Sequence, residues 1–416
     1  MLNGPFSPWP SFTQEEADAV SRVLLSGEVN YWTGSEGRAF EREFATFSGT
    51  DHAIAVANGT LALDLAYHGL GIGSHYGGAA TDEVIVTSRS FMASVSTIVN
   101  AGAVPVFADV DVQSGNITPE TVAPLINDNT RAVLCVHLAG WPCDMDGLRN
   151  VIGARDIRLI EDCAQAHGAL YKGTPVGGLG DVAAWSFCQD KIMSTGGEGG
   201  MVTCKDPDLW RRMWAFKDHG KSWEAVYERD HPSGFRWLHE TIGTNWRLTE
   251  MQSALGRIQL ARMSDWHAAR AANAERLTQA LTTFDGGIGP IRLAGQQCAD
   301  CNGCEGANAC RNAWYKYYAY VRPAALAPGW SRNRILAEIT AKGVPVMQGS
   351  CSEVYLEKAF DDTGWRPDST LSVARSLGET SLMFLVHPTL TKAQMDKACD
   401  VLHYVLTQAK ATLPTG

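Results

Sequence analysis

Short apolar runs alternate with amphipathic segments through the first half of the chain. The runs are rich in Val, Ile and Ala, which is typical of strands that are buried on both faces. They predict strands at 53–57, 83–87, 104–109, 131–137, 158–162, 183–187 and 200–204. The segments between them have helical spacing at 60–70, 91–101, 119–125 and 145–152. Strands that alternate with helices in this way indicate an α/β fold built on a largely parallel sheet.

Two further helices are predicted before the first strand, at 14–27 and 40–47, and Gly27 is a typical helix stop. After Gly220 the alternation ends, and residues 221–245 are predicted to form a polar loop with aromatic side chains. The remaining elements are a long helix at 248–277, an aromatic strand at 314–321 and helices at 331–342 and 391–409.

This change of pattern predicts two domains. Residues 1–250 would form a large domain, with an N-terminal segment that could pack against the small one. Residues 251–416 would contribute a linking helix and a smaller C-terminal α/β domain.

Charge and cysteine content narrow the class of protein. The formal net charge of −10 and the pI of about 5.6 argue against a nucleic-acid partner or an anionic membrane surface. No apolar run approaches the length of a membrane span, and residues 1–8 lack the basic and apolar regions of a signal peptide. Eleven cysteines without an export signal read as reduced thiols or metal ligands. We therefore expect a cytoplasmic protein.

The segment from Ser186 to Gly200 carries the most specific chemistry in the sequence. Lys191 lies five residues after Ser186, which ends a predicted strand, and just before a glycine-rich turn. A lysine in such a place is more often a surface charge. Here it emerges at a strand end beside glycines that allow a ligand to approach closely. A hydroxyl, an amine and a nearby carboxylate are the parts that hold pyridoxal 5'-phosphate, so Lys191 is a candidate for binding the cofactor aldehyde.

Asp162 supplies the carboxylate of this set. It ends the predicted strand 158–162, where a carboxylate could simply cap the next helix. Buried against a pyridine nitrogen, it would instead keep that nitrogen protonated. Gln165 follows three residues later and would reach the same pocket, where it could bond the ring hydroxyl.

Three other sites along the sequence could contact the same cofactor. Asn58, Gly59 and Thr60 open a predicted helix, either as an ordinary N-terminal cap or as a phosphate site. Phe91 opens the next one and could stack on a planar ring or pack in the core. Asn245 could be no more than the entry to the long helix.

A separate cysteine cluster lies in the C-terminal part. Cys298, Cys301, Cys304 and Cys310 suit zinc or an iron–sulfur cluster, but their spacing also fits a loop of exposed thiols. The cluster is far in sequence from the candidate cofactor residues, so we predict no metal in the catalytic site. His137 and His387 follow apolar runs and are expected to be structural. Candidates for contacting a second substrate are His219, His231, Tyr317 and Tyr355.

Taken together, the chain resembles the DegT-type (DegT/StrS) sugar aminotransferases, which are fold-type I pyridoxal-phosphate enzymes. The resemblance runs from Tyr31 to Pro388 and rests on residues 58–63, 161–168, 186–200 and 243–248. It implies a large domain with a mostly parallel seven-stranded sheet flanked by helices, plus a smaller C-terminal α/β domain.

The resemblance also assigns roles. Lys191 would bind the cofactor covalently and move the proton, and Asp162 would pair with the pyridinium nitrogen. Gln165 would contact the ring hydroxyl and Phe91 would stack on the ring. The residues expected to hold the phosphate are Gly59, Thr60 and Ser186, with Asn245 reaching the phosphate of the neighbouring subunit. This last role implies a homodimer with shared active sites.

The implied reaction moves an amino group from glutamate or glutamine to a keto sugar. A nucleotide-linked keto-deoxyhexose of amino-sugar and envelope polysaccharide synthesis, such as that of lipopolysaccharide, is the expected acceptor. An eight-carbon oxo sugar acid or an oxidised cyclitol is an alternative.

Two other functions use the same fold. One is a pyridoxal-phosphate sugar dehydratase, whose relatives replace the lysine with histidine, so Lys191 favours amino transfer. The other is a non-catalytic regulator, against which the intact set of Lys191, Asp162 and Ser186 argues. Asp190, directly before the lysine, has no role that the sequence explains.

Overall fold

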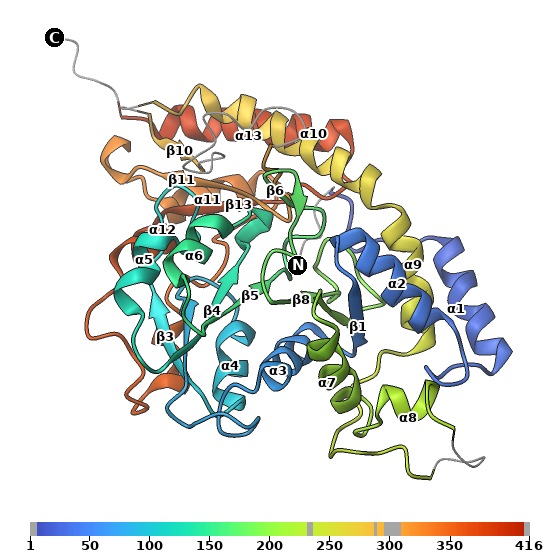
Figure 1. Cartoon of the computed structure of the whole chain (residues 1–416). Coiled ribbons are helices and arrows are strands. Elements are labelled where there is room, and N and C mark those ends of the chain that lie inside the picture. The colour runs from blue at the N-terminus through green and yellow to red at the C-terminus, as the bar shows by residue number, and fades with distance from the viewer. Residues whose placement is uncertain (1–5, 231–235, 287–288, 295–308, 412–416) are drawn as a thin grey trace.

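Seven strands form the larger of the two main sheets, in the middle of Figure 1. The computed structural model describes residues 6–230, 236–286, 289–294 and 309–411. The sheet has the order β1-β9-β8-β5-β4-β2-β3. Its strands are β1 (His52–Val56), β2 (Glu83–Thr87), β3 (Val104–Ala108), β4 (Thr130–Val136), β5 (Arg158–Asp162), β8 (Val182–Ser186) and β9 (Gly200–Cys204). Strands β3, β2, β4, β5 and β8 run parallel, whereas β9 is antiparallel to both of its neighbours. The prediction of a mostly parallel seven-stranded sheet is confirmed.

Helices cover both faces of this sheet. Side chains alternate along the strands, so that Ile85 joins one core cluster and its neighbours Val84 and Val86 join the other. Helices α3, α4 and α7 contribute to the second cluster, and α2 and α6 to the first. The helices of this part are α1 (Gln14–Ser26), α2 (Glu36–Ser48), α3 (Gly59–Leu70), α4 (Ala93–Asn100), α5 (Pro119–Val122), α6 (Met145–Ile152), α7 (Pro207–Lys217) and α8 (Trp223–Tyr227).

A second, antiparallel sheet lies above the first in Figure 1. Its order is β10 (Ile291–Leu293), β11 (Tyr317–Val321), β13 (Ser381–Phe384) and β12 (Val346–Met347). Its helices are α10 (Met263–Thr282), α11 (Arg332–Ala341), α12 (Ser372–Thr380) and α13 (Lys392–Ala409), and α10 packs along α13. A two-stranded hairpin, β6 (Leu170–Tyr171) and β7 (Thr174–Pro175), completes the strands. The predicted smaller C-terminal α/β part is therefore present.

Two predicted elements differ in detail. The long helix breaks at Arg262 into α9 (Glu250–Ala261) and α10, because the backbone N–H of Arg262 bonds to Gln259 O and its side chain reaches Glu15. The predicted loop 221–245 contains helix α8, whose first turn is capped by the Ser222 hydroxyl accepting from Ala225 N. Polar side-chain contacts therefore accompany a break and a start that the apolar spacing does not mark.

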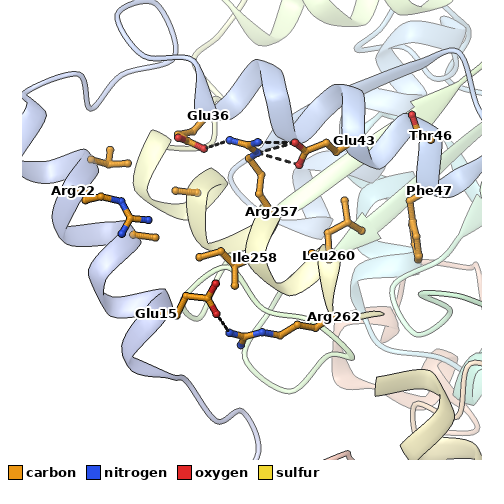
Figure 2. A pocket seen from close by; sticks show the side chains of 14 residues that line it. Glu15, Arg22, Glu36, Glu43, Thr46, Phe47, Arg257, Ile258, Leu260 and Arg262 are labelled. Carbon is orange, nitrogen blue, oxygen red and sulfur yellow. Dashed lines mark hydrogen bonds and ion pairs between the residues drawn. The ribbon is translucent and has the colours of Figure 1, made fainter. Parts of the chain in front are cut away.

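Helix α9 packs on α1 and α2, and a groove runs over their junction (Figure 2). Arg257 of α9 bonds Glu36 and Glu43 of α2, and Arg262 bonds Glu15 of α1. These pairs join the start of the C-terminal half to the first two helices.

The N-terminal segment crosses to the second sheet. Phe6 lies in the apolar core around β11 and β13, and Ser7 Oγ donates to Gln394 Oε1 of α13 over 3.2 Å. Trp9 packs edge-on against Trp266 of α10 at 5.1 Å between ring centroids. In the part of the chain that the structure describes, no helix is long and apolar enough to cross a membrane.

Candidate active site

A cavity of about 890 Å³ lies at the carboxyl edge of the large sheet and is lined by residues from the parts of the chain around both sheets. Carboxyl ends of parallel strands are where α/β folds bind ligands. The cavity brings together most of the predicted site residues: Gly59, Thr60, Phe91, Asp162, Gln165, Ser186 and Lys191. Asn245 is not among its lining residues. It is exposed and pairs with Asp218 through a backbone bridge.

The start of α3 forms an anion cradle at one end of the cavity. Asn58 Oδ1 accepts from Leu61 N at 2.9 Å, and the N–H groups of Gly59 and Thr60 lie in the first turn, which has no intrahelical partners for them. A Cβ on residue 59 would lie 2.7 Å from Ser186 Cβ, so only glycine lets the Ser186 hydroxyl approach the helix start. Hydroxyl and backbone donors around a helix N-terminus fit a phosphate group.

Asp162 lies at the other side of the cavity, at the end of β5. Its Oδ1 accepts from Ala164 N at 3.0 Å and its Oδ2 accepts from the Ser94 hydroxyl at 2.8 Å. Burial raises the pKa of Asp162, and the bond from Ser94 and the charge of Lys191 oppose that rise. A protonated ring nitrogen bound against this carboxylate would further favour its ionised form.

Glu161, the residue before Asp162, points to the opposite face and anchors the strand end. It accepts backbone N–H groups of Gly177, Leu179 and Gly180 and bonds His137 Nε2 at 3.0 Å. His137 Nδ1 accepts from Cys143 N at 3.0 Å, so the ring proton lies on Nε2. Both ring nitrogens are thus engaged. This supports the structural role expected of His137, although Glu161 and Cys163 offer metal-type atoms beside it.

Gln165 and Phe91 complete the ring-binding part of the cavity. Gln165 Oε1 accepts from Ala139 N at 2.7 Å, which leaves the amide nitrogen as the group that can donate to a ligand. Phe91 is 71% exposed at the cavity mouth, where its ring is open to a planar partner.

Lys191 lies in the loop between β8 and β9, and its backbone is held from several directions. Its N–H donates to Cys188 O at 3.0 Å, and its carbonyl accepts from Trp9 Nε1 at 2.7 Å. Its Nζ is 3.3 Å from Asp190 Oδ1. The loop therefore presents one amine to the same cavity as the carboxylate and the anion cradle, which is the donor set that pyridoxal phosphate requires.

This geometry agrees with comparisons to known proteins. The family model of the "DegT/DnrJ/EryC1/StrS aminotransferase family" matches residues 10–403. The chain belongs to this family. It is a pyridoxal-phosphate aminotransferase of fold type I, and its relatives include sugar aminotransferases.

Three relatives illustrate the match. A dTDP-3-amino-3,4,6-trideoxy-alpha-D-glucose transaminase of Streptomyces venezuelae is 33% identical over 92% of this chain and 90% of its own length. An L-glutamine:2-deoxy-scyllo-inosose aminotransferase of Streptomyces fradiae is 38% identical over 70% and 68%. The X-ray structure of an aminotransferase from Psychrobacter cryohalolentis has a TM-score of 0.93 and 56% identity, covering 97% of this chain and all of that one (100%).

The aminotransferase cavity also contains residues that the sequence did not single out. They come from α4 and from the second domain: Ser94, Tyr315, Tyr318, Ser350 and Cys351. Ser94 lies one turn after Phe91, so helical spacing could have suggested it. The others depend on how the two domains meet, for which the sequence carries no local signal.

The four candidates for substrate contact lie elsewhere or outside the described residues. Tyr317 is buried in the second domain's core and bonds Thr278, and Tyr355 is buried and bonds Glu353. His219 is exposed, away from the cavity lining. His231 falls outside the described residues.

The predicted cysteine cluster lies mostly outside the described residues, whereas His387 is described. Cys298, Cys301 and Cys304 also lie outside the described residues, whereas Cys310 Sγ accepts from Lys172 N at 3.3 Å. His387 is buried, stacks on Trp9 and bonds Thr389, in keeping with a structural role.

Proposed function

We propose that this aminotransferase moves an amino group from glutamate or glutamine to a nucleotide-linked keto-deoxyhexose, in the synthesis of amino sugars for envelope polysaccharide such as lipopolysaccharide. The observation that carries the proposal is the convergence of Lys191, Asp162 and the start of α3 on one cavity. The support for the acceptor class is the dTDP-sugar named for a relative that matches nearly the whole chain.

Each cavity residue has a role in this proposal. Bound pyridoxal phosphate supplies an electron sink for the substrate α-carbon. Lys191 holds the cofactor through its Nζ and then moves the proton as acid and base, and Asp162 keeps the ring nitrogen protonated. Gln165 donates to the ring oxygen and Phe91 covers the ring face. The phosphate is held by Gly59, Thr60 and Ser186.

The proposal includes a cytoplasmic homodimer with shared active sites. Asn245 is exposed and lies outside its own subunit's cavity, which supports a role for it at the phosphate of the neighbouring subunit. The cytoplasmic location rests on the eleven cysteines, which suit a reducing compartment.

Borohydride reduction of the holoenzyme, followed by peptide mapping, tests the role of Lys191. The reduced cofactor should be found on Lys191, and Lys191→Ala should abolish turnover and the absorbance of the lysine-bound cofactor. Label on another lysine, or full activity of the variant, would overturn the assignment.

A screen of acceptors tests the substrate. Continuous formation of the 2-oxo acid, which is 2-oxoglutarate from glutamate or 2-oxoglutaramate from glutamine, should require a nucleotide-linked keto sugar. Turnover with an oxidised cyclitol or an eight-carbon oxo sugar acid would move the proposal to that class. Loss of water from the keto sugar, with no amino group gained by it, would indicate a dehydratase instead.

A further inference from the structure

Asp190 bridges the proposed cofactor-binding lysine and a tyrosine of the second domain. We propose that Asp190, fixed by Tyr315, is a positioning residue that receives the Lys191 amine whenever this amine is not bonded to the cofactor. The inference rests on the proposed role of Lys191 and assigns a function to a carboxylate that the sequence left unexplained.

The two oxygens of Asp190 have different partners. Oδ1 lies 3.3 Å from Lys191 Nζ, and Oδ2 accepts a short hydrogen bond from the Tyr315 hydroxyl. Lys191 Nζ is also 5.2 Å from the centre of the Tyr315 ring. All three side chains line the cavity, so the contact is made where the cofactor would be held.

Tyr315 is itself firmly held. It is only 7% exposed, its N–H donates to Ala139 O at 3.1 Å, and its carbonyl accepts from Arg270 Nη1 at 3.3 Å. Arg270 is buried, and its guanidinium lies 5.1 Å from the ring centre of Trp9, the residue that bonds the Lys191 carbonyl. One buried cluster therefore fixes the backbone of Lys191 and, through Tyr315, the carboxylate beside it.

The surrounding charges favour an ionised Asp190. The groups that face the pair are the cations Lys191, Lys316 and Arg270. Burial alone would raise the pKa of Asp190, but the charge of Lys191 and the Tyr315 hydroxyl bring it below its usual value. Burial and the charge of Asp190 raise the pKa of Tyr315 well above its usual value, so the tyrosine keeps the proton that it donates.

Amino transfer requires the lysine amine to stay close to the cofactor after it is released. The lysine must leave the cofactor while the substrate amine is bound, act as acid and base nearby, and then return. A released lysine samples many rotamers, and selecting one of them costs conformational entropy. An ionised acceptor within 3.3 Å restricts the amine to the reacting side of the cavity.

The bridge also joins the two domains. Asp190 belongs to the loop between β8 and β9 of the large sheet, whereas Tyr315 lies two residues before β11 of the small sheet. Loss of the Tyr315 hydroxyl should therefore allow the Lys191 amine more freedom, although Lys191 and Asp190 themselves are unchanged.

The test measures how fast the lysine bonds to added cofactor. Apoenzyme is mixed with pyridoxal phosphate and the absorbance of the lysine-bound form is followed. We expect Asp190→Asn to slow bond formation about tenfold and Tyr315→Phe to slow it less, as for loss of one charge-assisted hydrogen bond. Both should lower kcat more than they raise KM for the amino donor.

Three controls separate positioning from folding. Affinity for pyridoxamine phosphate, which cannot bond to the lysine, should stay at the parental value in both variants. Asp146→Asn breaks a surface pair with Lys172 (2.8 Å), and Tyr404→Phe alters an exposed ring under Lys342 (4.2 Å). Neither should change the rate of bond formation.

The outcomes distinguish this inference from the proposed function. Parental bond-formation rates in Asp190→Asn and Tyr315→Phe, with the reduced cofactor mapped to Lys191, would overturn the role of Asp190 alone. Label on another lysine would overturn both. Should Asp190→Asn not fold, the rate in Tyr315→Phe decides, because that variant removes only a hydroxyl.

Discussion

The Ser94 hydroxyl donates to Asp162 Oδ2 over 2.8 Å, so the first turn of α4 holds the carboxylate at the end of β5. Ser94→Ala removes this donor from a buried, ionisable acceptor. We expect kcat/KM to fall about tenfold, the loss typical of a hydrogen bond to a charged group. Ser96→Ala, on the same helix but away from the cavity lining, is the matched control. Equal kinetics in the two variants would contradict a role for Ser94.

The contact between Gly59 and Ser186 makes a prediction about cofactor affinity. Gly59→Ala would place a Cβ 2.7 Å from Ser186 Cβ and displace the serine from the helix start. We expect the Kd for pyridoxal phosphate, measured by absorbance titration, to rise at least about tenfold. Pyridoxal, which lacks the phosphate, should lose much less affinity. An equal loss for both ligands would place the effect outside the phosphate cradle.

The ion pairs in the groove of Figure 2 should affect the stability of the protein but not its activity. Arg257 holds Glu43 with two nitrogens and Glu36 with a third contact, and the groups are partly exposed. Arg257→Ala should lower the free energy of unfolding by about 1 kcal/mol, since bidentate geometry strengthens an otherwise weak surface pair. Urea unfolding measures this. Arg22→Ala, an exposed arginine of the same groove, is the control and should change stability less.

The buried His167 should make the stability of the protein depend on pH. It is fully buried among Phe44, Trp185 and Phe187, and burial lowers its pKa to about 3. The unfolded chain takes up this proton near pH 6.5, whereas the folded chain resists it until about pH 3. Stability from this residue is therefore complete above pH 6.5 and falls by about 1.4 kcal/mol for each pH unit below it.

Replacing the imidazole tests that slope. His167→Asn should reduce the slope of the unfolding free energy against pH, between about pH 6 and 4, by about 1.4 kcal/mol per pH unit. This holds whatever the substitution does to absolute stability. A parental slope in His167→Asn would mean that the buried ring is protonated in the folded protein.

Apolar periodicity was sufficient to predict the strands of the large sheet, because buried parallel strands leave continuous runs of Val, Ile and Ala. It also located Asp162 and Ser186, since both end such runs. It could not predict the break at Arg262, where the apolar spacing continues and an ion pair with Glu15 intervenes.

The candidate site was predictable only on the side of the large domain. Asp162 lies at a strand end, Gly59 at a helix start and Lys191 in the glycine-rich loop after β8, and these positions have local signals. Asp190 and Tyr315 are 125 residues apart, and their hydrogen bond depends on how one domain packs on the other. Pairings of that kind are set by tertiary packing, which a single sequence does not reveal.

Hydrogen bonds to backbone atoms hold the loop that carries Lys191. Phe187 and Gln189 N–H groups bond to Gly199 and Gly197 across the loop, and Trp9 fastens the carbonyl of residue 191. None of these contacts uses the lysine side chain. A single substitution at residue 191 would therefore change the chemistry of this enzyme, while the residues that hold the cofactor stay in place.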